Sequence, residues 1–423
     1  MGAGLLTERA ALLEEIARQV GTPVYVYDAA AIERQYRVLS DALDPAPHRI
    51  FYSVKANSNL AVLGLLCRLG AGADIVSGGE LARVLRAGFP PADIVFSGVG
   101  KTAAELEAAL DSGVGVTNVE SRAELEQLEQ LARSRDAVAP FGVRVNPDVE
   151  PATHPYTQTG TRDQKFGVPH DRVIPLLEWA LERPALELVG MGMHIGSQIA
   201  DPSPYRAGAR RLVQLVAAAR DAGATTLRHV DFGGGIGIRY MNEPALEADV
   251  FGGAVRQLAQ ETGLPLVVEP GRFLLGNAGL LLARCLYRKA AGEKEFVIVD
   301  AGMNDLLRPS LYGAAHEVHV IDGPEQGGGG RVDVVGPVCE SGDFLALDRE
   351  LPGAVPGALL AILGAGAYGF SMSSSYNSRP RAAEVLLDGE RWAVVRARET
   401  VDDLMRGEHT IDDLDAGGWR ERE

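Results

Sequence analysis

The chain has few cysteines. Cys67, Cys285 and Cys339 are the only three in 423 residues, an odd number at wide spacing, and no secretory leader pattern precedes them. These features exclude the disulfide framework of a small secreted domain. We therefore expect a protein of the reducing cytoplasm.

Basic residues are also scarce, and long apolar runs are missing. Lys and Arg total 41 against 57 Asp and Glu, which gives a net charge of −16. Such an acidic balance argues against nucleic-acid and membrane-surface partners. No apolar run approaches the roughly 20 residues that span a bilayer. We expect neither kind of partner, and no metal site.

At 423 residues the chain exceeds one ordinary core, and its first part alternates strands with helices. Eight predicted strands in series, each followed by a helical pattern, indicate a (β/α)8 barrel. The predicted strands are residues 50–56, 72–77, 94–97, 114–119, 141–146, 188–195, 229–232 and 266–270.

The segments between these strands carry helix start signals. Thr102 with Glu105, and Ser121 with Glu124, have the spacing of capping boxes. One connection differs, because residues 148–170 lack periodicity and contain several turn formers. We predict a long loop there, on the side of the barrel where loops usually serve the site.

The rhythm changes after residue 272. Strands then follow one another without long helices, at residues 296–300, 331–335, 359–363 and 392–397, which indicates a second, all-β domain. The β-like run 23–28 precedes the barrel and is expected to pair with that domain, and the glycine run 327–330 is expected to be a loop within it. The predicted domains are a barrel of residues 29–272 and a discontinuous β domain of residues 1–28 plus 273–423.

Polar residues lie at nearly every predicted strand end. In such a barrel the reactive side chains sit at the carboxy-terminal strand ends, so these positions are the first candidates for a site. They are Lys55, Asp74, Ser77, Ser97, Asn118, Asn146, His194, Ser197, Gly233 to Gly235, and Glu269.

Lys55 is the most informative of them. A lysine at the end of a buried strand can be desolvated enough to lose its proton and attack a carbonyl, such as that of an aldehyde cofactor. A lysine there can equally be an ion-paired surface residue. Glu269 has two interpretations as well: an ion-pair partner of Arg272, or the acid that keeps a pyridine nitrogen protonated opposite Lys55. His194 is either a core histidine or a residue that stacks on the ring.

Glycine is abundant, with 50 residues, and one cluster has an informative position. Gly233-Gly234-Gly235-Ile236-Gly237 follows the seventh strand, and Glu269-Pro270-Gly271-Arg272 follows the eighth. In such barrels these two loops commonly bind a phosphate through backbone N–H groups that only glycine lets approach closely. A tight turn is the alternative for either loop alone.

The three cysteines differ in setting. Cys67 lies on an apolar helical segment and Cys285 in a β-like run, so both are expected to be small hydrophobic residues. Cys339 lies in Gly-Pro-Val-Cys-Glu-Ser-Gly-Asp, a turn-rich segment with two acids, where a thiol can be an accessible proton donor. An inert Cys339 is the other possibility.

Seven motifs together resemble the diaminopimelate decarboxylase family, over essentially the whole chain and in the family's order. They are Tyr-Ser-Val-Lys-Ala-Asn-Ser-Asn at 52–59, His-Ile-Gly-Ser-Gln at 194–198, Asp-Phe-Gly-Gly-Gly at 231–235, Glu-Pro-Gly-Arg at 269–272, Asp-Ala-Gly-Met-Asn-Asp at 300–305, Cys-Glu-Ser-Gly-Asp at 339–343 and Gly-Ala-Tyr-Gly at 366–369. The resemblance implies a fold-type III pyridoxal-phosphate enzyme, with a barrel of the alanine-racemase type and a carboxy-terminal β-sandwich or β-barrel domain completed by an amino-terminal strand.

The resemblance also implies an activity: removal of the carboxylate at the D-centre of meso-2,6-diaminopimelate, giving L-lysine and carbon dioxide, the last step of lysine biosynthesis. By the same matching, Lys55 is the cofactor lysine, Glu269 faces the pyridine nitrogen and His194 lies against the ring. The implied cofactor contacts are Lys55, Asp74, His194, Ser197, Gly234, Gly235, Glu269, Pro270, Gly271, Arg272 and Tyr368.

The implied substrate contacts are Arg272, Arg308, Tyr312, Glu340 and Tyr368. The far end of diaminopimelate is itself an amino acid, which needs guanidinium groups for its carboxylate and an acid for its ammonium group. Cys339 is implied to return the proton after carbon dioxide leaves, and in the family it comes from the neighbouring subunit of a homodimer. A homodimer with shared active sites is therefore expected.

Other functions stay open. A fold-type III decarboxylase for ornithine, arginine or carboxynorspermidine would keep Lys55, His194 and Glu269, but it would not need Arg308, Tyr312 and Glu340. A non-catalytic, cofactor-binding regulatory homologue would typically have lost the lysine or the thiol, and this chain keeps both.

Overall fold

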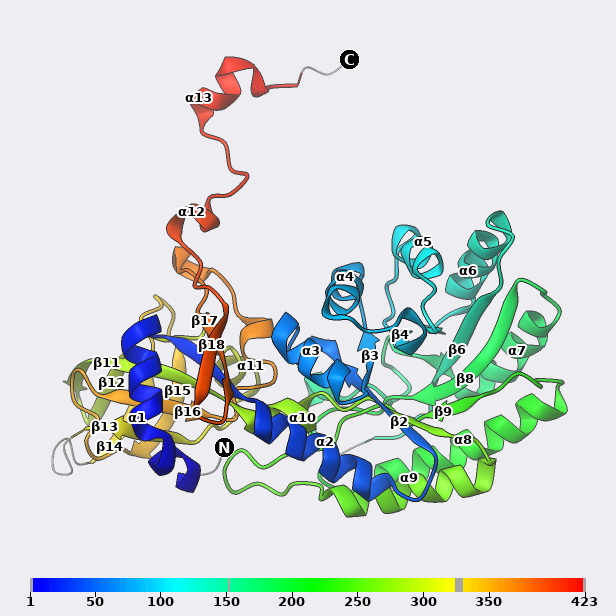
Figure 1. The fold of residues 1–423 in the computed structure, drawn as a ribbon, viewed down its shortest axis with the longest axis horizontal. Coiled ribbons are helices and arrows are strands. Elements are labelled where there is room, and N and C mark those ends of the chain that lie inside the picture. The colour runs from blue at the N-terminus through cyan, green and yellow to red at the C-terminus, as the bar shows by residue number, and fades with distance from the viewer. Residues whose placement is uncertain (1–2, 151–152, 324–329, 421–423) are drawn as a thin grey trace.

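The computed structural model describes residues 3–150, 153–323 and 330–420. Its first large unit is a closed barrel of eight parallel strands, in the order β2-β3-β4-β5-β6-β8-β9-β10 and back to β2 (Figure 1). The barrel strands are β2 (His48–Ser53), β3 (Gly72–Ile75), β4 (Ile94–Phe96), β5 (Val116–Val119), β6 (Ala139–Asn146), β8 (Leu186–Met193), β9 (His229–Asp231) and β10 (Leu266–Val268). All eight predicted strands are confirmed.

Helices surround the barrel. They are α2 (Ala29–Leu43), α3 (Leu60–Arg68), α4 (Gly78–Ala87), α5 (Ala103–Ser112), α6 (Arg122–Ser134), α7 (Val173–Leu181), α8 (Ser203–Asp221) and α9 (Ala248–Thr262). The reciprocal capping box of Thr102 and Glu105 is confirmed. At α6 only half of the predicted box forms: Ser121 accepts from the Glu124 N–H, while the Glu124 carboxylate accepts from Glu120 N–H and from the Lys101 ammonium.

Side-chain alternation along the strands separates two layers of core. Phe51, Val95 and Val267 form a small cluster with Val116 and Val189, whereas their chain neighbours, such as Ile50 and Tyr52, belong to the main core. Because successive strand residues face opposite sides, the small cluster fills the barrel interior and the main core packs the strands against the helices. A filled interior leaves the strand ends as the place for a site.

The second unit is a nine-stranded mixed sheet. Its order is β15-β14-β12-β11-β1-β17-β18, and β16 joins β11 to β13. The predicted run 23–28 forms β1, which lies antiparallel to β11 and parallel to β17, so the amino-terminal strand does complete this domain. The strands are β1 (Val24–Asp28), β11 (Gly279–Ala291), β12 (Lys294–Val299), β13 (Val318–Asp322), β14 (Arg331–Val335), β15 (Phe344–Glu350), β16 (Leu359–Leu363), β17 (Ala383–Asp388) and β18 (Arg391–Arg396).

Some elements of this unit were not predicted. The helix α1 (Ala3–Val20) packs Leu13 and Ile16 against Val24 and Val26 of β1. The short helices α10 (Arg272–Leu275) and α11 (Arg308–Tyr312) also fall here. The predicted glycine loop 327–330 lies outside the described residues except for Gly330, which precedes β14.

The long loop after the fifth barrel strand is confirmed for its described residues. Between Asp148 and His170 it contains only one 3-10 turn, Pro155–Thr157, and the two-residue strand β7 (Val168–Pro169) beside β6. Asn146 fixes its base by donating to the carbonyls of Thr161 and Phe166.

The two units meet at the turn that follows β2. The first predicted strand ends at Ser53 rather than Ala56, and Val54–Ala56 form a single 3-10 turn. Tyr368 donates its N–H to the carbonyl of Ala56 at 2.8 Å, and Asn57 donates to the carbonyl of Gly366 at 3.2 Å. The turn that carries Lys55 is thus held by the mixed sheet domain.

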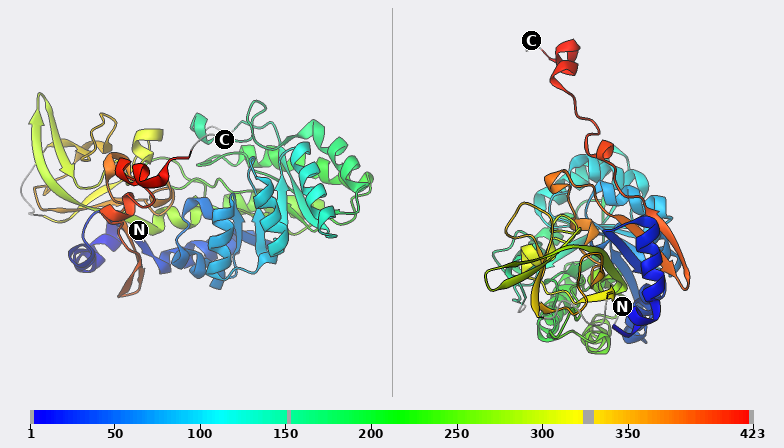
Figure 2. Two further views of the ribbon diagram at one scale, coloured as in Figure 1. Left: turned by 90° about the horizontal axis from the view of Figure 1, so that it is seen from above. Right: turned by 90° about the vertical axis from the view of Figure 1, so that its left-hand side faces the viewer.

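Past β18 the chain leaves the body. Figures 1 and 2 show residues from about 400 onward projecting into solvent, with the short helices α12 (Val401–Leu404) and α13 (Ile411–Asp413) along the way. We call residues 400–420 the arm. In the part of the chain that the structure describes, no helix has both the length and the apolar character needed to cross a membrane.

Candidate active site

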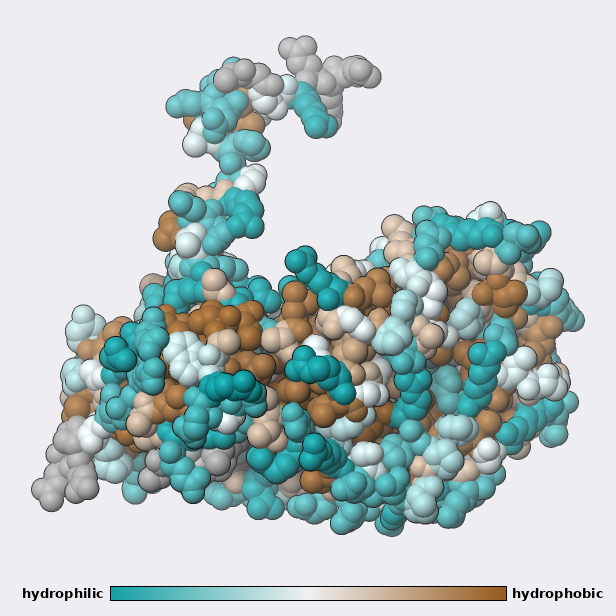
Figure 3. Space-filling model, viewed as in Figure 1, coloured by the Kyte–Doolittle hydropathy of each residue, from teal (hydrophilic) through white to brown (hydrophobic). Residues whose placement is uncertain are grey.

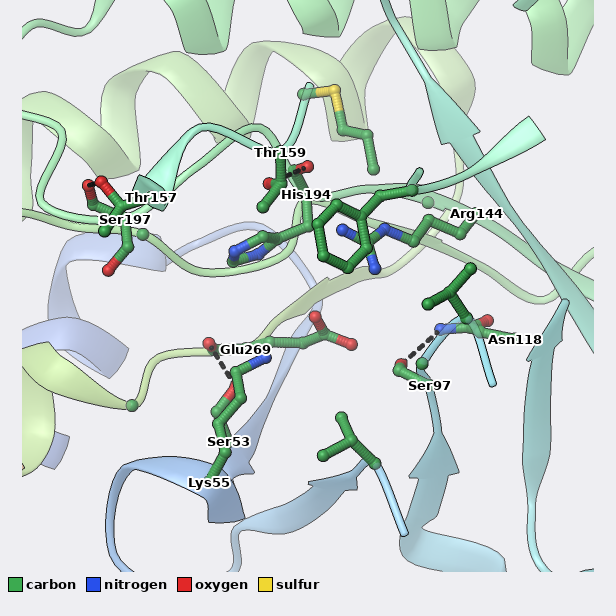
Figure 4. A pocket seen from close by; sticks show the side chains of 18 of the residues that line it. Ser53, Lys55, Ser97, Asn118, Arg144, Thr157, Thr159, His194, Ser197 and Glu269 are labelled. Carbon is green, nitrogen blue, oxygen red and sulfur yellow. Dashed lines mark hydrogen bonds between the residues drawn. The ribbon is translucent and has the colours of Figure 1, made fainter. Parts of the chain in front are cut away.

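A cavity of about 470 Å³ opens at the carboxy-terminal ends of the barrel strands (Figure 4). It brings together residues that the sequence spreads over more than 300 positions. The predicted site residues that line it are Lys55, Ser97, Asn118, His194, Ser197, Gly235, Glu269, Gly271, Arg272, Tyr312 and Tyr368. Of the other strand-end candidates, Ser77 caps α4 and Asn146 holds the loop after β6.

The remaining predicted residues lie elsewhere. Asp74 is buried behind Lys55, and Gly234 and Pro270 belong to the two loops beside the cavity. Arg308 is only 4% exposed and sits behind Tyr240. Cys339 and Glu340 are exposed on the surface of the mixed sheet domain and do not reach this chain's cavity.

Lys55 enters the cavity from its 3-10 turn, with 37% of its side-chain surface accessible. Its Nζ lies 3.7 Å from Asp74 Oδ2, which also accepts from Ser53 Oγ at 2.7 Å. Burial lowers the Lys55 pKa, but Asp74, Tyr368 and Glu269 together raise it above its usual value. Of the two interpretations of Lys55, the raised pKa and the contact with Asp74 favour the ion-paired one.

Glu269 follows β10, the strand next to β2, so it lies beside Lys55 in the cavity wall rather than opposite it. Its Oε1 is buried without a hydrogen-bond partner. Burial raises its pKa well above the usual value, with Asp231 and Asp74 adding to the effect. Asp231 shares a hydrogen bond with Glu269, and its Oδ1 accepts from the Gly233 N–H at 2.8 Å. Burial raises the Asp231 pKa to about 6. The predicted alternative, a Glu269–Arg272 ion pair, does not occur among the described contacts.

His194 lies on the opposite wall from Lys55 (Figure 4). Its Nδ1 accepts from the Gly234 N–H at 3.2 Å, so the free Nε2 carries the ring proton. Burial lowers the His194 pKa well below its usual value, and the positive charges of Lys55 and Arg144 lower it further. A neutral, flat imidazole therefore faces the cavity.

The glycines of the first phosphate-type loop are required by space. A Cβ at Gly234 would lie 2.0 Å from the carbonyl oxygen of Glu269, and one at Gly235 would lie 2.2 Å from that of Gly196. Gly235 also has a φ of +95°, which side-chain-bearing residues rarely adopt. The loop packs backbone against backbone and leaves its cavity side open.

Two buried arginines form a cationic corner. Arg272 donates to Ser197 Oγ at 3.0 Å and to the Tyr240 hydroxyl at 2.6 Å, and its guanidinium lies over the Tyr368 ring. Arg308 also stacks on Tyr240, with its guanidinium 4.2 Å from the ring centroid. Among the described residues neither arginine pairs with a carboxylate, so the corner is built to receive an anion from outside.

His316 holds Arg308 in place. The ring is fully buried, its Nε2 lies 2.9 Å from Arg308 Nη1, and its Nδ1 lies 2.7 Å from the carbonyl of Leu363. Burial, followed by the charge of Arg308, lowers the His316 pKa to about 3. A neutral His316 therefore donates to Leu363 and accepts from Arg308.

Sequence reasoning missed several of these residues. Arg144 lines the cavity and is held by Glu120, but it lies inside β6 rather than at its end. Its two-residue spacing from Asn146 was the available signal, because both face the same side of the strand. Asp231, Tyr240 and His316 were not assigned, since their partners come from distant segments.

The residues present fit pyridoxal phosphate. The cavity offers an amine for the aldehyde, an unpartnered buried carboxyl oxygen for the pyridine nitrogen, a flat neutral ring, and a glycine loop beside Ser197 and Arg272 for the phosphate. The described residues hold no cluster of metal-ligating side chains.

Comparison with known proteins gives the class. Residues 29–276 match the family model described as "Pyridoxal-dependent decarboxylase, pyridoxal binding domain". The parallel barrel with its lysine, joined to a mixed sheet, thus defines a pyridoxal-phosphate-dependent decarboxylase.

Whole-chain relatives narrow the class to a family. The chain is 50% identical to diaminopimelate decarboxylase of Pseudomonas aeruginosa, over 94% of this chain and 95% of that protein. It is 48% identical to that of Pseudomonas fluorescens, over 97% and 98%. The crystal structure of diaminopimelate decarboxylase from Helicobacter pylori complexed with L-lysine matches with a TM-score of 0.90 at 41% identity, over 96% and 100% of the two chains. The chain belongs to the diaminopimelate decarboxylase family.

Proposed function

We propose that this cavity removes the D-centre carboxylate of meso-2,6-diaminopimelate and releases L-lysine and carbon dioxide. The observation that carries the proposal is the pairing of Lys55 with Glu269, whose buried Oε1 has no partner on its own chain. A buried acceptor without a donor costs free energy unless a ligand supplies one. A protonated pyridine nitrogen is such a donor.

Bound pyridoxal phosphate supplies an electron sink for the charge left at the substrate carbon. Lys55 would hold its aldehyde carbon covalently through Nζ, and Asp74, 3.7 Å away, is placed to take up the proton that Nζ must lose. Glu269 would keep the pyridine nitrogen protonated, with Asp231 fixing the carboxyl group. Ser197, Gly235, Gly271 and Arg272 would receive the phosphate.

The second amino-acid end of the substrate distinguishes diaminopimelate from shorter substrates. Its carboxylate fits the cationic corner of Arg272 and Arg308, where Tyr312 and Tyr368 also lie near the cavity mouth. Its ammonium group needs an acid, which the resemblance assigns to Glu340. Ornithine has no second carboxylate, so an ornithine decarboxylase would leave two buried guanidinium groups without an anion.

Glu340 and Cys339 would reach the cavity from a second copy of the chain. Both are exposed on a turn that Asp343 makes rigid, by accepting from the N–H groups of Met303 and Val338 at 2.6 Å. A rigid exposed thiol suits the return of a proton to a neighbouring cavity. We therefore propose a homodimer with two shared sites, located in the cytoplasm.

Product analysis tests the activity. The protein with pyridoxal phosphate is incubated separately with meso-diaminopimelate, the LL isomer, L-lysine and L-ornithine, and products are separated by chromatography. We expect lysine from the meso compound alone. Absence of lysine there, or faster turnover of ornithine, would contradict the proposal. A cofactor-binding protein inactive on all four would instead favour a regulatory homologue.

Variants test the lysine and the sharing of sites. Lys55→Ala should abolish the visible absorption band of the covalently bound cofactor, and Cys339→Ala should lose most turnover. Mixing the two inactive variants should restore up to about a quarter of the activity, because a mixed dimer has one intact site. No recovery after subunit exchange would refute shared sites.

A further inference from the structure

We infer that the arm, residues 400–420, docks on the second copy of the chain in the dimer. The arm contacts little of its own chain: the hydrogen bonds described for residues 400–420 all close within the arm itself. This inference rests on the homodimer proposed above, and it adds a surface that the shared-site argument does not require.

The arm carries apolar groups that are left in water. Val401, Met405, Ile411 and Trp419 are 61%, 51%, 60% and 62% exposed, respectively. Figure 3 shows a few hydrophobic residues on an otherwise largely hydrophilic projection. In a helical turn residues three and four apart share a face, so Val401, Leu404 and Met405 form one apolar face and Ile411 and Leu414 begin another.

The sequence of the arm nevertheless contains signals that start helical turns. Thr400 with Asp403 and Thr410 with Asp413 are complete capping boxes, each starting a helical turn. Helices of three or four residues are unstable alone in water. The two helical turns of the arm therefore need another surface on which their apolar faces can pack. The sequence thus prepares the arm for docking.

The root of the arm lies beside the surface that meets the second copy. Cys339 donates its N–H to Asn377 Oδ1 at 2.9 Å. A few residues further along, Arg381 donates its N–H to the carboxylate of Glu399 at 3.0 Å, and Glu399 returns a bond to the Arg381 carbonyl. The segment from Asn377 to Arg381 therefore joins the thiol turn to the last anchored residue before the arm.

The link between the Cys339 turn and the arm indicates that the arm docks on the second copy of the chain. If Cys339 of one copy reaches the other copy's cavity, the surface around Asn377 and Arg381 faces that cavity's rim, and the arm begins there. The 19 residues from Val401 to Trp419 could span at most roughly 60 Å, and the helical turns α12 and α13 shorten that reach. That rim offers apolar residues of its own, since Val76 and Val99 line the cavity and are 37% and 41% exposed.

Sedimentation equilibrium tests the docking. A chain ending at Glu399, and a full-length Val401→Asp/Ile411→Asp variant, should each raise the dimer dissociation constant at least tenfold. Both should still bind pyridoxal phosphate, because no arm residue lines the cavity. Val138→Asp is the matched control: Val138 is 55% exposed before β6, away from the cavity, and should leave the constant unchanged. An unchanged constant in both arm variants would overturn the inference.

Crosslinking identifies the surface that receives the arm. A photoreactive residue replaces Met405 in unlabelled chains, which are mixed with 15N-labelled chains and irradiated. We expect crosslinked peptides that join an unlabelled arm to labelled residues near Val76 or Val99. Crosslinks confined to one chain would overturn the inference.

The experiments distinguish failure of the arm docking from failure of the proposed shared active site. Suppose that mixing Lys55→Ala with Cys339→Ala restores activity and that the arm variants dimerise normally. This result would refute docking of the arm and would support the shared active site. A fully active monomer would refute both.

Discussion

His316 gives the sharpest test of the substrate corner. Its ring joins two buried partners, with Nε2 at 2.9 Å from Arg308 Nη1 and Nδ1 at 2.7 Å from the carbonyl of Leu363. Replacing it with alanine removes both partners at once. A buried polar group left without a partner costs about 1–3 kcal/mol, so His316→Ala should lower the free energy of unfolding by about 2–6 kcal/mol.

The same change should weaken substrate binding. The Arg308 Nε has no hydrogen-bond partner, and Nη1 is held by His316. Without His316, only stacking on Tyr240 orients the guanidinium. A hydrogen bond involving a charged group contributes about 1.5–3 kcal/mol, which corresponds to a rise in KM for diaminopimelate of about ten- to a hundredfold. The turnover number should change much less, because Arg308 lies away from Lys55 and Glu269.

Two amide variants separate the effects. In His316→Gln the amide lies near the position of Nε2 and can still accept from Arg308, whereas in His316→Asn it lies near Nδ1 and can still donate to Leu363. We expect Gln to restore KM and Asn to restore part of the stability. Steady-state kinetics and urea unfolding measure the two quantities, and His319→Ala, on the partly exposed β13, is the control. Equal KM in the Gln and Asn variants would refute a positioning role for His316.

Three further outcomes follow from the geometry. The His316 pKa of about 3 lies below its usual 6.5, so its contribution to stability is complete above pH 6.5 and is lost as the pH falls towards 3; the slope of unfolding free energy against pH should flatten by up to about 1.4 kcal/mol per unit in His316→Gln, and an unchanged slope would contradict a neutral ring. Gly234→Ala should weaken pyridoxal phosphate binding at least about a hundredfold by fluorescence titration, because its Cβ would meet the Glu269 carbonyl, while Gly253→Ala, which has open space, should bind normally. Glu269→Gln should keep the cofactor but lose at least about a hundredfold in kcat, since an amide cannot hold the pyridinium charge; near-full kcat would remove Glu269 from the chemistry.

Much of the fold could be predicted because each barrel strand is a short buried run with a helix behind it. The polar residues at the strand ends then gave the positions of Lys55, His194 and Glu269 before any coordinates. The shorter strands of the mixed sheet were harder, since β13 and β15 are partly exposed and lack a continuous apolar run.

The charge of Lys55 could not be predicted from its own segment. It depends on the register of β2 against β3, which places Ser53 beside Asp74 and brings the Asp74 carboxylate to Nζ. The Arg308–His316 contact depends likewise on where the chain returns after α11. Sequence patterns locate residues on elements, whereas contacts between elements also require the register.

The position of β1 has a consequence for synthesis of the chain. This strand, buried at all five residues, lies between β11 and β17, yet about 250 residues (from 29 to 278) separate it from β11. At about 5–20 residues per second, the ribosome needs roughly 12–50 seconds to make the intervening barrel, and until then Val-Tyr-Val-Tyr-Asp has no sheet to join. The nascent chain therefore carries an unpaired, aggregation-prone strand during the time in which the barrel is synthesised and folds. A shortened chain without β1 would keep an open slot in the sheet, which a synthetic peptide with the sequence of β1 could fill.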